Sequence, residues 1–452
     1  MNKCTRFLSR AGLAAFGQWI TEEQIWAEVE NEVVIEQKVV QHTPHEKLLD
    51  AFINIVAGGQ GVVEVNTRVR SEGALGLAFG REKCAEQSTV SRTLSACQEA
   101  SVVGMRAVVE RLLRGYGQAY QHDYGTQWQL LDVDMTGLPA GRQGEQVTKG
   151  YFGGHRSRRG RQLGRVLATQ YDEILVDRLY PGTKQLDQSL PELVEAAFQV
   201  LEMTAEQKQK SIVRVDGGGG KDADINWLLN QGLGVLVKVH NWKRAQKLAG
   251  FVECWYPDPK VPERQLGWCT QPHAYVKPTY QIVERSLNKK NQWHYRVVVT
   301  NLPPEVLFWL AHQPLRKHPS QQQLMIAIAH AYDLRGGAAE TSVRNSKQGL
   351  SIGKRNKRSF HAQEMLILLA HLAYNLLTCF RSLLAQVVPL WASYGVLRLI
   401  RDAFHISGLV QLGPDNRISA LAFNQTHLLA KEFFRAFQPF KPHDLSLYLR
   451  KI

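Results

Sequence analysis

Cysteine is scarce and scattered in this sequence. None of the six cysteines forms a CxxC pair or stands with histidine at the spacing of zinc ligands. This pattern excludes a zinc finger or a disulfide framework and indicates free, mostly buried thiols in a reducing compartment. Internal repeats and low-complexity tracts are also missing, so a repeat architecture is not expected.

Long hydrophobic runs are missing too. The most apolar stretch, 365–380, is about 16 residues long, short of the roughly 18–20 that a membrane span needs, and contains His371 and Asn375. At the start, a weakly apolar stretch follows basic residues, but Gly17 and Gln18 interrupt it and no clear cleavage site follows. We therefore expect a buried helix at 365–380, a surface or partner helix at the start, and a soluble, cytoplasmic protein.

Acidic residues are the minority among the charges. The chain has 55 Lys and Arg against 41 Asp and Glu, a net charge of +14. Such a surface favours polyanions, so nucleic acid is the expected partner, although ribosome-associated and membrane-surface proteins share this composition. At 452 residues the chain is long enough for two or three domains.

Residues 1–122 predict a helical N-terminal region with a helix-turn-helix unit at about 80–100. A short helix around 81–86 would lead into a second helix that opens at Ser88 or Thr89, with Val90, Leu94 and Cys97 inward. Small polar groups and one arginine would then face outward, able to meet base edges and phosphates in a major groove. An ordinary helical hairpin is the alternative. The expected DNA contacts on this helix are Thr89, Ser91 and Arg92.

After about residue 122 the pattern changes to mixed strands and helices. Three strands are followed by a helix, a strand, a helix and a strand, which is the order of an RNase H-like fold, a mixed five-stranded sheet flanked by helices. The fold class is therefore multidomain α/β. The core is expected at 123–240 and 321–405, a β-rich insertion between them at 241–320, and a C-terminal segment at 406–452. The strands are expected at 128–135, 161–170, 172–180, 211–216 and 234–240.

Three acidic residues stand where these elements end. Asp134 ends the first strand, Asp216 ends the fourth, and Glu340 lies on a helical stretch. Carboxylate oxygens suit Mg²⁺, and two such ions are the usual catalysts of phosphodiester cleavage, with Mn²⁺ as a substitute. We predict a two-metal site with Asp134 bridging the ions. Asp132 is on the same face as Asp134, and the alternation alone does not separate them; an acid at a strand end also commonly just caps a turn.

The glycines at 217–220 do not form a phosphate loop of the P-loop type. The run GGGGKDAD lacks the Ser or Thr that follows Lys in that motif. We interpret it as a turn that lets a DNA backbone approach the metal site.

Together these motifs resemble the DDE transposases of bacterial insertion sequences, in the subgroup with a Tyr, Arg, Glu, Lys signature. The resemblance covers roughly residues 80–405, and its DxT pattern is matched by Asp134-Met135-Thr136, which favours Asp134 over Asp132. The second motif is matched by VRVDGGGG, which contains Asp216. The third is matched by Tyr332, Arg335, Glu340 and Lys347, followed by LLAHLAYNLL at 368–377.

The resemblance implies an enzyme that binds the inverted-repeat ends of a mobile element, cuts them by hydrolysis and joins the freed 3′-hydroxyl to target DNA. Tyr332, Arg335 and Lys347 would hold the phosphate near the cut, excision would commonly pass through a DNA hairpin, and a homodimer would act on paired ends. An aromatic side chain would stack on a flipped base. The candidates are Trp242, Trp255, Trp268 and Trp293.

One spacing departs from the family pattern. Family members place three residues between the Arg and the Glu, whereas four lie between Arg335 and Glu340. At ~100° per residue the extra position turns Arg335 by ~100° relative to Glu340, unless the helix begins after Gly336 and Gly337 or a bulge absorbs one residue.

Basic clusters flank the acidic segments at 155–165, 240–247 and 353–361. Charge runs are often only solvated faces, but these lie where a DNA track would pass. Two other functions remain open: a non-catalytic DNA-binding protein that acts through its helix-turn-helix unit, and another RNase H-like nuclease. The further DNA contacts expected from these clusters are Arg158, Arg159, Trp242, Lys243, Arg244, Lys354 and Arg355.

Overall fold

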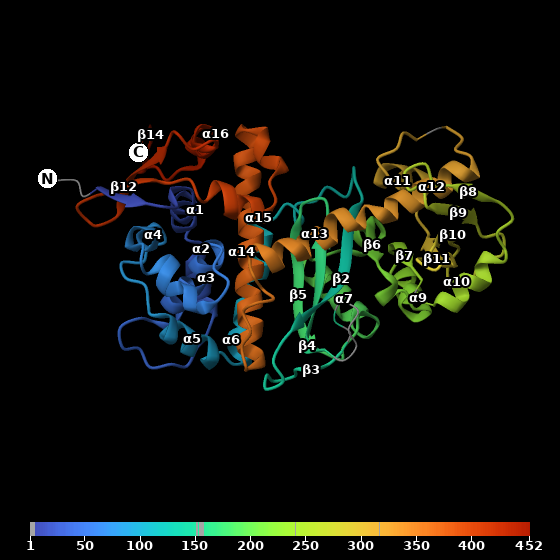
Figure 1. The fold of residues 1–452 in the computed structure, drawn as a ribbon, viewed down its shortest axis with the longest axis horizontal. Helices are drawn as coiled ribbons and strands as arrows, with labels where there is room; N and C mark the ends of the chain where they lie inside the picture. Colours follow the sequence, from blue (N-terminus) through green and yellow to red (C-terminus); the bar gives the residue numbers. More distant parts are fainter. Residues whose placement is uncertain (1–4, 151, 153–157, 240, 316) are drawn as a thin grey trace. The chain divides into compact units, whose positions relative to one another are not determined.

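The computed structural model of the chain describes residues 5–150, 152, 158–239, 241–315 and 317–452. It divides into two compact units. A helical unit combines Met1–Gly117, Leu138–Val147 and Val343–Ile452, and a sheet unit combines Gln118–Gly137 and Thr148–Ser342. The α/β class expected from the sequence is confirmed (Figure 1).

The sheet unit is built on one mixed sheet. Its elements are β2 (Gln129–Pro139), β3 (Thr148–Lys149), β4 (Arg159–Ala168), β5 (Glu173–Pro181), α7 (Leu190–Val200), α8 (Ala205–Gln209), β6 (Ser211–Val215), α9 (Asp222–Asn230), β7 (Gly234–Lys238), α10 (Trp242–Ala249), β8 (Trp255–Pro257), β9 (Arg264–Trp268), β10 (Tyr280–Leu287), β11 (Trp293–Thr300), α11 (Pro304–Leu310) and α12 (Gln321–Asp333). α13 (Arg335–Gln348) begins in this unit, whose last residue is Ser342, and its remaining residues from Val343 on belong to the helical unit.

The centre of the sheet follows the predicted strand order. Among the described residues the order is β3-β4-β2-β6-β7-β11-β10-β9-β8, with β5 paired to β4. β2 and β6 run parallel, as do β6 and β7, whereas β4 and β5 run antiparallel. The five predicted strands therefore lie in the order three, two, one, four, five. The expected pairing of the first and fourth strands is confirmed, and it brings their carboxyl ends to the same edge.

The predicted β-rich insertion extends this sheet instead of forming a separate one. β11 pairs antiparallel with β7, opposite Leu236, Val237 and Lys238, and β10, β9 and β8 follow outward. Ile282 and Val298 from these strands join the same apolar core as α12. α12 packs on β9, β10 and β11 and ends at Asp333, and the predicted Tyr, Arg, Glu, Lys signature begins at that end.

The helical unit is organised around one long helix. Its elements are β1 (Thr5–Leu8), α1 (Ala11–Glu22), α2 (Ile25–Glu32), α3 (Pro44–Val56), α4 (Gly73–Ala78), α5 (Gln87–Ala96), α6 (Glu99–Tyr116), α14 (Phe360–Val387), α15 (Val396–Arg398), β12 (Gly408–Leu412), β13 (Ile418–Asn424), α16 (Ala430–Phe437) and β14 (Ser446–Arg450). α14 contacts α3, α5, α6 and α16. In length and composition it could cross a membrane, but 72% of its most apolar window is buried inside the protein, as expected for 365–380.

The start of the chain differs from the expectation in two ways. The stretch predicted to be helical begins with β1, which pairs antiparallel with β12 some 400 residues later. Local pattern could not reveal so short a strand with so distant a partner. The next helix, α1, is a core element and not a surface or partner helix, because Phe16 and Trp19 pack against the ring of Phe380.

The predicted helix at 81–86 is wrong. α4 ends at Ala78, and residues 79–86 form an irregular segment before α5. Buried Asp50 holds this segment open, since it accepts hydrogen bonds from the backbone N–H of Ala85 (2.7 Å) and from Nε of Arg81 (3.0 Å). The bond from the Ala85 N–H replaces the i→i−4 bond that this group would make in a helix. The second predicted helix exists as α5, with Val90 and Leu94 buried.

The segment predicted as the second half of the core, 321–405, divides between the two units. α12 packs on β9, β10 and β11, whereas 343–405 belongs to the helical unit. α14 is apolar on most of its circumference, so it needs neighbours on several sides, and α3, α5, α6 and α16 supply them.

Candidate active site at the ends of β2 and β6

Two of the predicted acids lie together in the sheet unit. Val133 on β2 is paired with Val215 on the parallel strand β6, so Asp134 and Asp216 each follow directly at the same edge. The Asp216 carboxylate accepts a 2.8 Å hydrogen bond from the backbone N–H of Gly218, which orients it at the start of the glycine turn. The fold therefore places two carboxylates side by side, as the strand order predicted.

Asp132 has a different role from Asp134. Its carboxylate is almost fully buried and accepts bonds from Nε (2.7 Å) and Nη2 (2.8 Å) of Arg214 and from the Thr169 hydroxyl (2.8 Å). Arg214 Nη1 also donates to the backbone carbonyl of Ala331 on α12 (2.7 Å). The Asp132 oxygens are thus occupied by these protein donors, and the structure separates the two aspartates that the alternation left open.

Arg335 contacts the first acid directly. Its Nη2 lies 2.9 Å from Oδ1 of Asp134 and 3.3 Å from the carbonyl oxygen of Val133. Burial raises the pKa of Asp134, the charge of Asp216 adds to the rise, and Arg335 opposes it. Burial alone would lower the pKa of Arg335, but Asp134 and Asp216 outweigh it and raise that pKa. Arg335 is therefore a fixed cation beside the acid pair.

Tyr332 reaches the same place from the end of α12. Its side chain is 7% exposed, and the Nζ of Lys238 on β7 lies 4.3 Å from the centre of its ring. Burial raises the pKa of the Tyr332 hydroxyl, which keeps it a hydrogen-bond donor at neutral pH. The sequence analysis missed Lys238; the lysine that ends the buried strand GVLVK was the available signal.

Glu340 does not join the two aspartates. α12 ends at Asp333 and α13 begins at Arg335, so Gly336 and Gly337 lie inside the first turn of the new helix. Five positions separate Arg335 from Glu340, which places Glu340 ~140° around the helix axis from Arg335. Its side chain is exposed. Within the part of the chain that the structure describes, no three His, Cys, Asp or Glu side chains gather to hold a metal ion.

The interruption between α12 and α13 at Leu334 explains the direction of Glu340. Neither adjustment suggested by the spacing occurs among the described backbone, because α13 starts before the glycine pair and is an uninterrupted α-helix. The extra residue between Arg335 and Glu340 therefore rotates Glu340 around the axis of α13 relative to Arg335. The roles of Glu340 and of Lys347, which is half-buried on the later part of α13 within the helical unit, stay predictions.

The predicted contacts on α5 lie on its accessible side. Arg92 is exposed, and Thr89 is half-buried with its hydroxyl donating to the Glu86 carbonyl (2.7 Å). Ser91 is also half-buried, and its hydroxyl accepts a 2.6 Å bond from Nζ of Lys357. Arg92 is thus the most accessible of these three side chains.

The cluster at 353–361 needs a correction. Arg355 is 5% exposed and donates to the backbone carbonyls of Gly59 and Leu350, and burial lowers its pKa to about 10. It connects two loops of the helical unit and is not available to DNA. Lys354 donates to the side chain of Gln60 (2.6 Å).

The clusters in the sheet unit are more open. Arg158 and Arg159 are exposed; residues 155–157 of that cluster lie outside the described residues. Lys243 is exposed, whereas Arg244 forms a bidentate ion pair with Asp222.

The predicted tryptophans differ in exposure. Trp242 is 64% exposed and lines a pocket of about 360 Å³ with Gly220, Lys221 and Asn241, just beyond the glycine turn that follows Asp216. Trp293 is 42% exposed, and it and Trp255 hold the Arg285 guanidinium between their rings, at 4.4 and 4.0 Å from the ring centres. Trp268 is half-buried against Tyr280.

Comparison with known proteins defines the class. The sequence matches the family described as Transposase DDE domain group 1 over residues 5–401, nearly the whole chain. The chain belongs to this family of DDE transposases, whose members generally use divalent metal ions. The resemblance drawn from the motifs is confirmed.

One similar solved structure is the "piggyBac transposase synaptic complex with hairpin DNA". The identity is 11%, the match covers 89% of this chain and 82% of that chain, and the TM-score is 0.46. No curated protein sequence matches this chain.

Proposed function

We propose that this protein is a DNA transposase that cuts the inverted-repeat ends of an insertion sequence by metal-dependent hydrolysis and joins the 3′-hydroxyl to target DNA. The observation that carries the proposal is the pair Asp134 and Asp216 at adjacent parallel strand ends, in a chain of the DDE transposase family. We further propose that it works as a homodimer on paired ends, in the bacterial cytoplasm where the chromosome lies.

The donor set fits one divalent cation. Mg²⁺ is commonly bound through one or two carboxylates and keeps several waters, and Asp134 and Asp216 supply two such groups. When bound, the cation would lower the pKa of an attacking water, and a second cation would stabilise the charge of the leaving oxygen. The second ion of a two-metal site, with Mg²⁺ or Mn²⁺, needs Glu340 as well, and that residue would have to turn toward the pair.

Arg335 and Tyr332 are proposed to hold the phosphate at the cut. The buried Nε of Arg335 has no hydrogen-bond partner among the described residues, which leaves one donor for a phosphate oxygen. The Tyr332 hydroxyl stays protonated and can donate a second bond. Two fixed donors from the helix ends would orient the phosphorus for in-line attack.

Trp242 is the candidate to stack on a flipped base. It is the most exposed of the four predicted tryptophans, and its pocket begins at the glycine turn after Asp216. A base unstacked near the cut would find an exposed aromatic ring, with the Nζ of Lys243 6.0 Å from the ring centre.

A non-catalytic DNA-binding protein is the second candidate function. The observation that favours it is the outward position of Glu340, which leaves the acid pair without a third carboxylate. In this case α5 would still contact DNA through Arg92, although the predicted helix-turn-helix now has an irregular connection of eight residues.

Cleavage of a duplex that carries the inverted repeats flanking the coding region separates these two candidates from each other and from a sequence-independent nuclease. The transposase should nick this duplex at the repeat ends in Mg²⁺ and should join the cut end to a second DNA. A sequence-independent nuclease would cut control duplexes equally well and would join nothing. A DNA-binding protein would retain the duplex without cutting it.

A further inference from the structure

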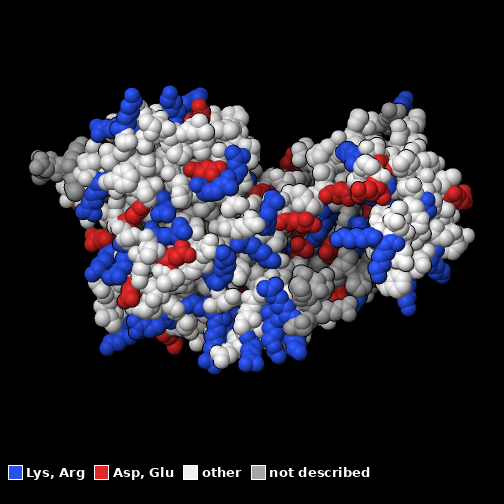
Figure 2. All heavy atoms as spheres, in the orientation of Figure 1, with Lys and Arg blue, Asp and Glu red and all other residues white. Residues whose placement is uncertain are grey.

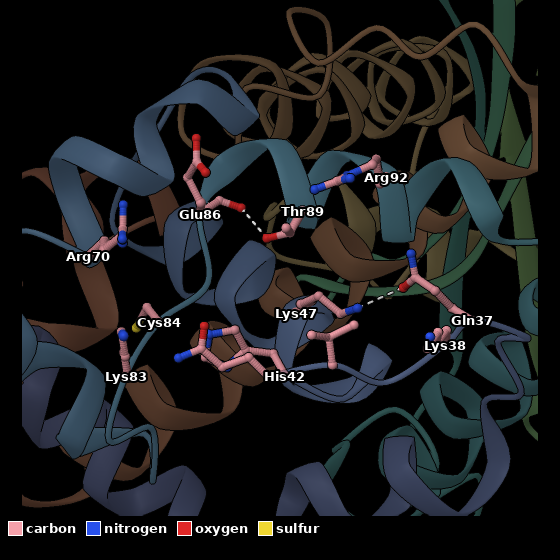
Figure 3. A pocket seen from close by; sticks show the side chains of 12 residues that line it. Gln37, Lys38, His42, Lys47, Arg70, Lys83, Cys84, Glu86, Thr89 and Arg92 are labelled. Carbon is pink, nitrogen blue, oxygen red and sulfur yellow. Dashed lines mark hydrogen bonds between the residues drawn. The ribbon is translucent and has the colours of Figure 1, made fainter.

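The helical unit contains a basic pocket that the proposed cleavage chemistry does not use. It has a volume of about 410 Å³ and lies between α3, the segment before it, and the connection into α5 (Figure 3). Five cations line it, against one carboxylate, Glu86. Figure 3 shows the Glu86 carboxylate directed away from His42 and Lys47. The five cations are Lys38, Lys47, Arg70, Lys83 and Arg92.

Most of these cations lack a protein counter-ion. Lys38, Arg70, Lys83 and Arg92 are exposed at the rim, and none is in an ion pair within the described part of the chain. Lys47 is 6% exposed and donates to the side-chain oxygen of Gln37 (2.7 Å), a neutral partner. The pocket therefore keeps a concentrated positive charge.

The acidic residues closest in sequence to Lys47 form ion pairs with Arg81, which does not line the pocket. Glu46 and Asp50 on α3 both pair with Arg81. An Nη of Arg81 also donates to Nδ1 of His42 (3.2 Å), which makes the imidazole neutral with its hydrogen on Nε2. Glu46 and Asp50 share the one guanidinium of Arg81, and Glu46 also acts on Lys47, so these acids offset the charge of the five cations only in part.

The positive charge is large enough to affect the groups in the pocket. Burial lowers the pKa of Lys47, and the charge of Arg92 adds to the decrease. Burial likewise lowers the pKa of His42, and Arg81 and Lys83 lower it further, although Asp50 and Glu46 oppose them. An anion in the pocket would relieve this repulsion.

We propose that this pocket binds neighbouring phosphate groups, supplied either by the backbone of a DNA strand or by a free polyphosphate. Each phosphate offers several strong acceptor oxygens and at least one full negative charge, so two or more are needed to balance the excess of cations. A volume of about 410 Å³ is that of a ligand pocket and exceeds the space of one ion.

Figure 2 agrees with a basic surface here, since Lys and Arg side chains lie over the visible face of the helical unit near α4 and α5, with acidic ones between them. The DNA source rests on the proposed function, whereas the free polyphosphate does not. Binding is therefore measured in EDTA, so that the result does not depend on whether this chain cuts DNA.

The test uses the full chain and a double variant, Lys38→Gln with Lys83→Gln, at exposed pocket positions that belong to no other proposed DNA contact. Its matched control is Lys431→Gln with Lys451→Gln, which removes two exposed lysines of the same unit outside the pocket. Affinity for a duplex is measured between about 50 and 200 mM salt. Each lost phosphate contact should make the negative slope of log K against log salt shallower by about 0.9. The slope of the pocket variant should therefore be shallower by about 2, and that of the control variant almost unchanged.

A second arm identifies the source. Inorganic pyrophosphate is added, and the thermal midpoint of unfolding is recorded. A reduced salt slope in the pocket variant, without stabilisation of the wild type by pyrophosphate, supports a DNA backbone. Stabilisation of the wild type that the variant loses supports a free polyphosphate.

The double variant Lys38→Arg with Lys83→Arg, which keeps both charges, should retain most of whichever effect the pocket variant loses. The proposal is overturned if the pocket and control variants behave alike in both arms. It is also overturned if poly-glutamate stabilises the wild type as well as pyrophosphate does at equal charge.

Discussion

Arg335 Nη2 lies 2.9 Å from the Asp134 carboxylate, and this contact determines how the third motif is oriented at the acid pair. Because Arg335 is the first residue of α13 and points at Asp134, the helix phase directs Glu340 ~140° away from the same contact. A single extra residue between the two signature positions thus separates the third acid from the other two.

Removal of Gly337 should restore the family spacing. Glu340 would then lie four positions after Arg335, ~40° from it around the axis, on the side that faces Asp134. We expect cleavage of an end-containing duplex to increase at least tenfold, because a third carboxylate would join the metal ligands. Gly337→Ala, which keeps the length and meets no atom within 4 Å, is the control. A rate in the deletion variant at or below that of the wild type would show that Glu340 is not the missing ligand.

Asp132 should matter for stability more than for chemistry. Asp132→Ala would leave Arg214 as a buried, unpaired charge, and the expected loss is about 3–5 kcal/mol in the unfolding of the sheet unit. Glu192→Ala breaks a partly exposed ion pair with Arg178 in the same unit and should cost about 1 kcal/mol or less. Urea unfolding followed by tryptophan fluorescence measures both. Equal midpoints for the two variants would contradict the structural role of Asp132.

Trp242 should affect the cut end and not general affinity for DNA. Trp242→Ala is expected to reduce cleavage roughly tenfold, since loss of one base-stacking contact costs about 1–3 kcal/mol. Affinity for a duplex without repeat ends should stay the same. Trp309→Ala, at a 40% exposed tryptophan of the same unit away from that pocket, is the control. Fluorescence of 2-aminopurine at the repeat end reports the flipped base directly, and an unchanged signal with Trp242→Ala would remove this residue from the site.

Two buried cysteines should resist alkylation. Burial raises the pKa of both Cys84 and Cys97 to about 12, so at pH 8 only about one thiol in ten thousand is the reactive thiolate. Their reaction with iodoacetamide should accelerate only as the pH rises toward 12 or the protein unfolds. Exposed Cys254 should react at once. Mass spectrometry of a time course at pH 8 checks this, and labelling of Cys97 as fast as Cys254 would contradict the packing of α5.

The strand order and the acid pair were predictable because both are local patterns. Alternation in LLDVDM and the buried run SIVRV specify strands that end in an acid, and the order of elements then makes those ends neighbours. The pattern could not tell Asp132 from Asp134, because both point to the same face. That distinction comes from Arg214, which is opposite Asp132 only once the register of β2 and β6 is known.

Other features depend on contacts that the sequence does not display. The helix expected at 81–86 fails because Asp50, some 35 residues earlier, takes the hydrogen bonds of that segment. In the sequence Arg355 is part of a basic cluster, but in the structure its side chain is buried and donates to two backbone carbonyls. The spacing between Arg335 and Glu340 did indicate that Glu340 could be rotated away from the aspartates. Its actual direction depends on where α13 begins, which the sequence does not specify.

Cleavage of an inverted-repeat duplex by the wild type and by Asp216→Asn, with Mg²⁺ and with EDTA, tests the central claim most directly. The account predicts Mg²⁺-dependent nicks at the repeat ends by the wild type, their loss by at least a hundredfold in Asp216→Asn, and nearly equal affinity of both proteins for the duplex. Equal cleavage by Asp216→Asn, or binding by the wild type with no cleavage in Mg²⁺ or Mn²⁺, would contradict it.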